Sequence, residues 1–188
     1  MRYDARQDVN AVYELIATLF EFEDAPERAM AIAGALIELG EDRSWASVWW
    51  AYGAVHHDLS DEAYARALEL LARVDRSENA RAAALMFIAE IESTQAIDAG
   101  SSPDPRRQAT LLSEAVALAP LWPSLRLRVA YPLRELGQSD ASCREAQAAL
   151  DLLDRAENTG DPFESAISGA SLDREYVVGE AKAFGVEA

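Results

Sequence analysis

The densest group of chemically active side chains lies at residues 56–62, which read His-His-Asp-Leu-Ser-Asp-Glu. Imidazoles and carboxylates are the ligands that zinc and other divalent metals bind. Successive side chains on a helix point about 100° apart, however, so at most one of His56 and His57 would join such a site. Asp61 and Glu62 also suit the first turn of a helix, where the helix dipole favours acids. We therefore predict no metal site and no cofactor.

The sequence contains one cysteine that could act as a nucleophile, Cys143, and the histidine nearest to it in the sequence is His57. A catalytic thiol needs a base within hydrogen-bond reach, and these two residues lie far apart in the chain. Cys143 stands among alanines, as a small packed thiol does. The sequence contains neither a phosphate-binding glycine-rich loop nor a Gly-x-Ser-x-Gly elbow. We predict that the protein is not an enzyme.

The charge of the chain narrows the classes of partner. Seventeen basic and 33 acidic residues give a net charge of −16, and half of the 188 residues are hydrophobic. This balance argues against nucleic acid and anionic membranes as direct partners and favours a cationic or neutral one. A solvated acidic surface without a binding role is the alternative.

The start of the chain is polar, and no apolar run reaches membrane-spanning length. From this we expect a cytoplasmic protein. A single cysteine also rules out a disulfide within the chain.

The elements that would position any site are helices throughout. Apolar residues recur at helical spacing, and Ser, Asp, Pro and Gly mark the ends of the segments. Gly40 is expected to stop the second helix, and Gly34 and the neighbouring alanines to permit close helix contact. The helices are expected near residues 8–22, 26–39, 44–55, 61–74, 77–99, 105–118, 123–136, 140–155 and 172–184.

A helical repeat is indicated by small residues at fixed spacing. Ala115 and Ala149 lie 34 residues apart, with Pro120 and Gly137 marking the turns between them. Thirty-four residues is the period of one class of helical repeat.

An earlier segment has Trp49, Gly53, Ala65 and Ala72, at spacings of four, twelve and seven residues. These residues resemble the motif of the tetratricopeptide repeat family. The resemblance covers roughly residues 41–155. It implies an all-α, right-handed α-solenoid of antiparallel helix pairs that serves as a binding scaffold.

The two matching segments are offset by 77 residues. Gly53 aligns with Ala130 and Ala72 with Ala149. Two periods and an insertion of nine residues near the loop at residues 100–105 account for this offset. Ser142 stands where the family has alanine, and Pro132 lies inside a helix.

The resemblance also divides the single expected domain, residues 1–188, into three parts. Residues 1–40 form a divergent first helix pair, residues 41–155 carry the repeats, and residues 156–188 form a C-terminal cap. Such a cap covers the open end of a repeat array. A detachable or partner-binding tail is the other interpretation of the last helix.

In this family the first helix of each pair lines the concave surface. The resemblance therefore implies partner-contacting positions, in a groove suited to a peptide with bulky side chains. The carboxylate-binding residues of some family members are not matched here. Trp50 fits the groove and the core equally well, whereas for Tyr131 and Arg134 we favour the groove. The implied positions are Trp50, Ala54, His57, Leu127, Tyr131 and Arg134.

The most consistent function is a non-catalytic scaffold that binds a protein or peptide, basic or with apolar anchor side chains. A dedicated chaperone and an immunity-type inhibitor of a cationic partner both fit. The alternative is a small-molecule or metal sensor, or an enzyme, built in the helical stack. Self-association through an apolar face of residues 1–40 is a third hypothesis.

Overall fold

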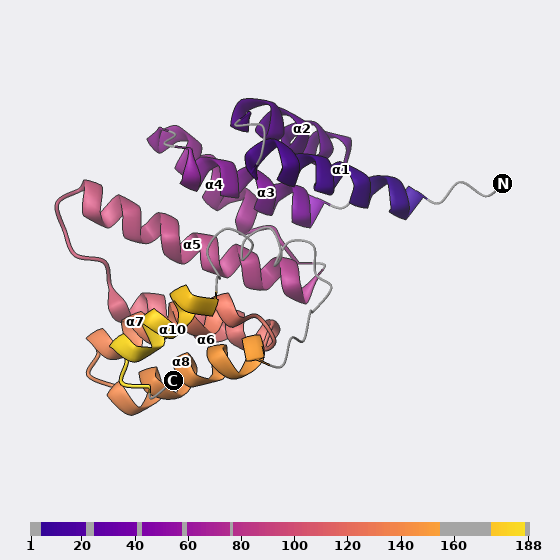
Figure 1. Ribbon diagram of the computed structural model, residues 1–188. Coiled ribbons are helices and arrows are strands. Elements are labelled where there is room, and N and C mark those ends of the chain that lie inside the picture. The colour runs from indigo at the N-terminus through magenta and orange to yellow at the C-terminus, as the bar shows by residue number, and fades with distance from the viewer. Residues whose placement is uncertain are drawn as a thin grey trace. The chain divides into compact units, whose positions relative to one another are not determined.

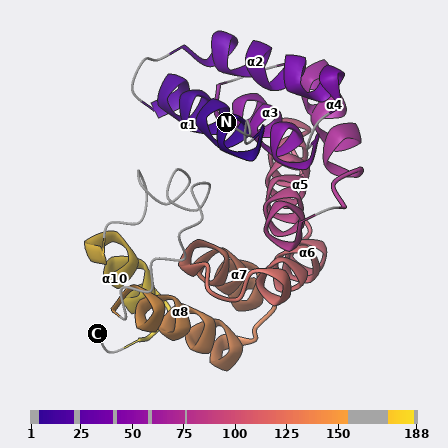
Figure 2. The ribbon, with the colours of Figure 1, turned by 90° about the vertical axis from the view of Figure 1, so that its right-hand side faces the viewer.

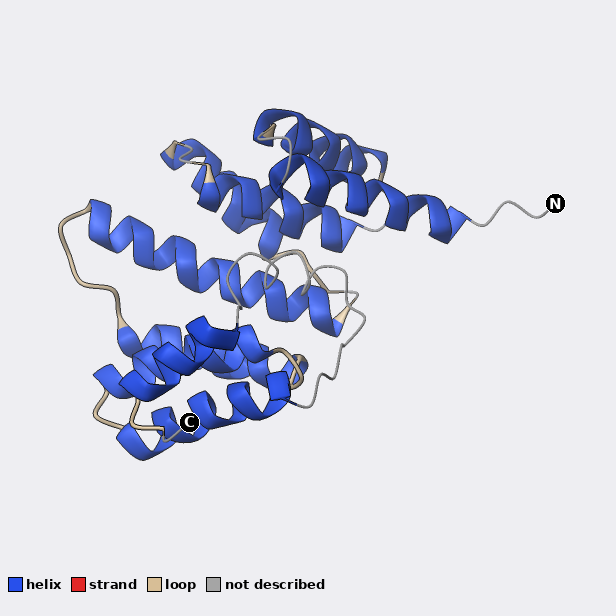
Figure 3. Cartoon of the chain, in the orientation of Figure 1, coloured by secondary structure: helices blue, strands red, loops and turns tan. Residues whose placement is uncertain are grey.

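The computed structural model describes residues 5–21, 25–40, 43–57, 60–75, 77–154 and 174–186, and within these ranges every regular element is an α-helix (Figure 1, Figure 3). The all-α prediction is therefore confirmed. The helices are α1 (Ala5–Glu21), α2 (Pro26–Leu39), α3 (Arg43–His56), α4 (Asp61–Leu71), α5 (Glu78–Asp98), α6 (Pro105–Leu118), α7 (Pro123–Glu135), α8 (Ser139–Asp154) and α10 (Arg174–Ala183).

Several helix ends follow the predicted signals. The Ser60 side chain accepts a hydrogen bond from the Ala63 amide, and Asp104 accepts from the amides of Arg106 and Arg107. Gly40 ends α2 with a φ of 81°, a left-handed conformation that glycine adopts without strain. Two further helix-start patterns of the sequence, Asp24 two residues before a proline and the Asp-Pro-Phe-Glu segment at 161–164, lie outside the described residues.

The chain forms two compact units, Met1–Ala80 and Arg81–Ala188, which we call unit 1 and unit 2. The boundary falls in the first turn of α5, inside the stretch that resembles repeats. Among the described helices, none combines the length and the apolar character that crossing a membrane requires.

Unit 1 is built from consecutive packed helices: α1 against α2 and α3, α2 against α3, and α3 against α4. Its aromatic residues stack in the core. The ring of Phe20 lies 6.0 Å from that of Trp49 and 5.0 Å from that of Tyr52, measured between centroids. Aromatic pairs at such separations stabilise a core beyond the area they bury.

Two glycines in unit 1 have opposite surroundings. A Cβ atom built on Gly53 would lie 2.6 Å from Cγ of Met30 and 2.9 Å from Cζ of Phe20. Gly53 is therefore a point of close helix contact, as the small residue of a repeat motif would be. A Cβ on Gly34 would meet nothing within 4 Å, so the expectation that Gly34 permits close helix contact is wrong.

Unit 2 continues the same pattern, with α6 against α7, α7 against α8, and α8 against α10 (Figure 2). Its buried apolar cluster joins three of these helices, which Figure 1 and Figure 2 both show side by side. The buried members are Leu127 and Ala130 from α7, Ala146, Ala149 and Leu150 from α8, and Val177, Ala181, Phe184 and Val186 from α10 and the residues after it.

Ser142, which stands where the repeat family has alanine, has a defined partner in unit 2. Its side chain is almost fully buried, and its hydroxyl donates a hydrogen bond of 2.7 Å to the carbonyl oxygen of Ala130. The serine thus adds a polar link between α8 and α7. The nearby Pro132 does not end α7, which continues to Glu135.

Candidate functional site

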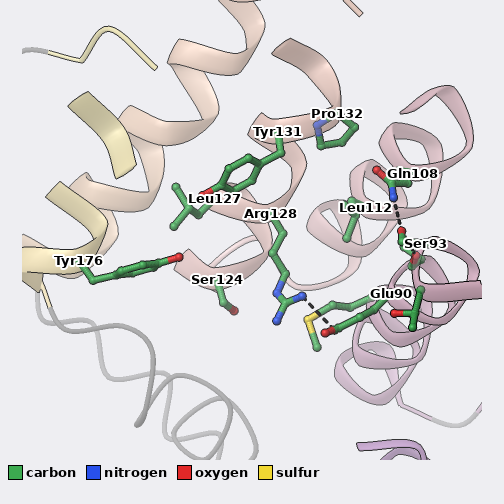
Figure 4. Close-up of a pocket in the computed structure, with 13 residues that line it drawn as sticks. Glu90, Ser93, Gln108, Leu112, Ser124, Leu127, Arg128, Tyr131, Pro132 and Tyr176 are labelled. Carbon is green, nitrogen blue, oxygen red and sulfur yellow. Dashed lines mark hydrogen bonds and ion pairs between the residues drawn. The ribbon is translucent and has the colours of Figure 1, made fainter. Parts of the chain in front are cut away.

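A pocket of about 430 Å³ lies within unit 2 (Figure 4). Ligand sites in proteins commonly have volumes of roughly 300–1,000 Å³. Four helices supply its walls. The lining residues are Met86, Ala89, Glu90, Ser93 and Thr94 from α5, Gln108 and Leu112 from α6, Ser124, Leu127, Arg128, Tyr131 and Pro132 from α7, and Tyr176 from α10.

Helix α7 contributes most of the chemistry because one of its faces points into the pocket. Ser124, Leu127, Arg128 and Tyr131 follow one another at helical spacings of three, four and seven residues from Ser124, which places them on one side of the helix. The start of α7 is fixed by Trp122, which is buried just before Pro123 in the first helical position.

The pocket combines an apolar floor with side-chain hydrogen bonds at its rim. Met86, Leu112 and Leu127 are all buried and supply the apolar surface. On the α5–α6 side, Gln108 donates a hydrogen bond to the Ser93 hydroxyl (Figure 4). This link joins α5 to α6 beside the pocket.

The charges in the pocket wall neutralise each other. The Arg128 guanidinium binds the Glu90 carboxylate at 3.0 Å, which connects α7 to α5 (Figure 4). The two side chains are 36% and 24% exposed, so the pair is partly shielded from solvent. An ion pair of this kind positions two helices more than it stabilises them.

Tyr131 connects the pocket to α10. Its hydroxyl donates a hydrogen bond to the Glu180 carboxylate, and its ring meets that of Phe184 edge-on at 5.0 Å. Burial raises the pKa of the Tyr131 hydroxyl well above its ordinary value, and the neighbouring Glu180 raises it further. Tyr131 is therefore a neutral hydrogen-bond donor at physiological pH.

Ser124 is a buried residue of the pocket lining. The residue is 6% exposed, and its Oγ is the single buried side-chain polar atom without a hydrogen-bond partner among the residues that the structure describes. In Figure 4 the Ser124 side chain lies between Tyr176 and Arg128. A buried polar group without a partner costs about 1–3 kcal/mol, so its presence calls for an explanation.

Arg134 lies outside the pocket lining and holds α10 instead. Its guanidinium donates a hydrogen bond of 3.1 Å to the carbonyl oxygen of Ala183 and lies 4.8 Å from the centre of the Phe184 ring. Together with Tyr131, it fixes the end of α10 against α7. This contact fits the interpretation of the last helix as a cap that packs on the preceding helices.

The structure brings two of the six predicted partner-contacting residues into the pocket, Leu127 and Tyr131. Arg134 lies on the same helix outside the lining, and the remaining three lie in unit 1. Ala54 is fully buried, and Trp50 is 9% exposed with the Arg66 guanidinium 5.1 Å from its ring centre. His57 is half-buried, with its ring stacked on Phe20 at 5.3 Å.

The structure describes only part of the histidine and acid cluster at residues 56–62. His56 and His57 lie at the end of α3, and the ring of His56 lies 4.5 Å from that of Tyr52. Asp58 lies outside the described residues. Within the described part of the chain, no group of three or more His, Cys, Asp or Glu side chains has a geometry suited to a metal ion.

Sequence reasoning missed four pocket residues: Ser124, Arg128, Glu90 and Tyr176. The helical spacing of Ser124 and Arg128 with Leu127 and Tyr131 could have identified the first two, because all four share one face of α7. Glu90 and Tyr176 could not be found this way, since they reach the pocket from α5 and α10 through tertiary packing.

Comparison of the chain with protein-family models, with curated proteins and with solved structures finds no match.

Proposed function

We propose that this protein is a non-catalytic binding protein that holds a peptide segment of a partner protein in the unit 2 pocket. The observation that carries the proposal is the unpartnered Ser124 hydroxyl above an apolar floor. Such a pocket suits a side chain that has an apolar body and one hydrogen-bonding group. Among the described lining residues there is neither histidine nor cysteine, and the one carboxylate among them, that of Glu90, is paired with Arg128.

The architecture that we propose is the tetratricopeptide-like one, a right-handed solenoid of antiparallel helix pairs. Two features support it. Consecutive helices pack against each other from α1 to α4 and from α6 to α8. In unit 2 the small motif residues Ala115, Ala130 and Ala149 are fully buried, whereas Ala65 and Ala72 of the unit 1 match are exposed. Helical-repeat scaffolds of this kind bind extended or helical segments.

The proposed partner carries a positive charge together with an apolar anchor. The net charge of −16 would attract such a protein at long range, and the pocket would then receive the anchor. A dedicated chaperone and an immunity-type inhibitor of a basic protein both match this description, and both would act in the cytoplasm.

A small-molecule sensor is the second candidate, favoured by the pocket itself. A volume of about 430 Å³ and polar groups from α5, α7 and α10 are what a small ligand would need. In that case the same lining residues would hold a free compound instead of a side chain.

The test uses two matched variants at exposed or half-exposed threonines. Thr94→Trp places a large ring in the pocket wall, whereas Thr110→Trp places it on the exposed side of α6, outside the pocket. The tagged proteins are purified from the source cells, and the bound proteins are identified by mass spectrometry. A stoichiometric partner that the wild type and Thr110→Trp retain, and that Thr94→Trp loses, is the expected result.

Two other results would count against the proposal. A partner that remains bound to Thr94→Trp would place binding outside the pocket. Recovery of the wild type without any protein partner would favour the second candidate, and thermal-shift screening with small compounds would then follow.

A further inference from the structure

We propose that the unit 2 pocket selects an aromatic ring that carries a neutral hydrogen-bonding group, as in a tyrosine side chain of the bound segment. This inference rests on the proposed function, because it names the anchor that the pocket receives. Three features of the pocket carry it: the unused Ser124 hydroxyl, the balanced charge, and the surfaces available to a ring.

The Ser124 hydroxyl requires a polar ligand atom. Ser124 is 6% exposed, and its Oγ has no hydrogen-bond partner among the described residues. A hydroxyl can donate one hydrogen bond and accept others. A purely apolar ligand would leave it unpaired and more deeply buried, whereas a phenol could both donate to it and accept from it.

The balanced charge favours a neutral group over an ion. Arg128 already binds Glu90 at 3.0 Å, so an incoming carboxylate would meet Glu90 beside Arg128. An incoming ammonium group would in turn meet Arg128. Glu180, which accepts a hydrogen bond from the neutral Tyr131 hydroxyl, is not among the residues that line the pocket. Burying an ion without a full countercharge is unfavourable.

The surfaces of the pocket suit a ring. The thioether of Met86 makes favourable contacts with aromatic rings, and the Arg128 guanidinium can lie against a ring face. Tyr176, which is 50% exposed, forms the wall contributed by α10 and offers a second ring surface (Figure 4). A phenol ring therefore matches the floor, the wall and the hydroxyl of this pocket together.

The test compares small probes that differ in one group. Binding of p-cresol, toluene and benzoate to the full chain is measured by amide chemical-shift titration. We expect p-cresol to bind roughly two- to tenfold more tightly than toluene, the range that one added hydrogen bond gives. Benzoate should bind more weakly than p-cresol, and the shifted amides should include those of Ser124, Leu127 and Arg128.

Ser124→Ala supplies the decisive variant. It removes a hydroxyl that has no partner within the described protein, so the variant should fold. It should lose the preference for p-cresol and keep its affinity for toluene. Ser113→Ala, at an exposed position on α6, is the matched control and should keep the preference. Equal binding of p-cresol and toluene to the wild type, an unchanged preference in Ser124→Ala, or tighter binding of benzoate would each overturn the inference.

Capped Gly-Tyr-Gly and Gly-Phe-Gly peptides separate this inference from the proposed function. Tighter binding of the tyrosine peptide, abolished by Ser124→Ala, would support both. A preference for free p-cresol without any binding of either peptide would support the ring chemistry while overturning the peptide-binding function. Binding of both peptides without a preference for tyrosine would support the peptide-binding function and overturn the inference about the ring.

Discussion

Helices α3 and α7 place residues at matching positions 77 residues apart, yet these residues have different surroundings. On α3, Trp50 and Ala54 are buried within the protein, and an aromatic cluster fills the space near His57. On α7, the corresponding Leu127 and Tyr131 line a pocket. The difference shows that residues with the same spacing along two helices can lie in a filled core or beside a pocket, depending on the neighbouring side chains.

The two helices also differ in how they meet their neighbours. Gly53 on α3 has no side chain, and Met30 and Phe20 occupy the space beside it. The matching position on α7 is Ala130, and its carbonyl oxygen accepts the Ser142 hydrogen bond. In unit 1 the side chains of neighbouring helices thus fill the space at this position, whereas in unit 2 a hydrogen bond also joins the two helices.

Gly53→Ala should destabilise unit 1 by about 3 kcal/mol, near the upper end for overpacking of a core. The reason is that the new Cβ would lie within 2.9 Å of the Phe20 ring and closer to the Met30 side chain. Chemical denaturation followed by circular dichroism measures the change. Gly34→Ala is the matched control inside α2, and it should gain up to about 1 kcal/mol from helix propensity. Equal stability of the two variants would contradict the close contact at Gly53.

Tyr131→Phe should lower the stability of unit 2 by about 1–2 kcal/mol, because it removes the hydrogen bond to Glu180 and keeps the ring contact with Phe184. Tyr176→Phe is the comparison variant: its ring lies half-exposed in the first turn of α10, and its hydroxyl neighbours that of Tyr131, so it should change stability less. Chemical denaturation monitored by circular dichroism gives both values.

The stability difference between wild type and Tyr131→Phe should also depend on pH. The pKa of Tyr131 is raised in the folded protein, so its contribution is complete below the unfolded pKa of about 10 and is lost as the pH rises above it. The free energy of unfolding should therefore differ between wild type and Tyr131→Phe by a constant amount up to about pH 10, and the difference should shrink above that pH. A difference that grows with pH would contradict the assigned environment of Tyr131.

Ser142→Ala and Ser124→Ala compare two buried serines of unit 2. Ser142→Ala should cost about 1 kcal/mol, because it removes a satisfied hydrogen bond to Ala130. Ser124→Ala should leave stability unchanged or raise it by up to about 1 kcal/mol, because its hydroxyl has no partner in the described protein. Thermal unfolding of the two variants side by side measures the contrast, and similar losses in both would show that the Ser124 hydroxyl is satisfied in the folded protein.

Much of the fold could be predicted from the sequence because its signals are local. Helix spacing located all of the described helices, and Ser60, Asp104 and Gly40 marked ends that the structure confirms. Gly34 shows the limit, since a small residue within a helix does not reveal whether another helix lies against it.

The pocket was only partly predictable. Leu127 and Tyr131 followed from the repeat positions, but Arg134 contacts α10 instead of the pocket. Glu90 and Tyr176 reach the pocket from other helices, and the ion pair of Glu90 with Arg128 spans 38 residues of sequence. Such contacts depend on tertiary packing, which the spacing within one helix does not encode.

The central claim is that a partner enters the unit 2 pocket, and site-specific photocrosslinking in the source cells tests it most directly. A benzophenone amino acid replaces Tyr176 in the pocket wall or, in the control, Leu39, which is 75% exposed in unit 1. Our account predicts one discrete crosslinked protein at position 176 and none at position 39. Crosslinking at position 39 alone, or at neither position, would contradict it.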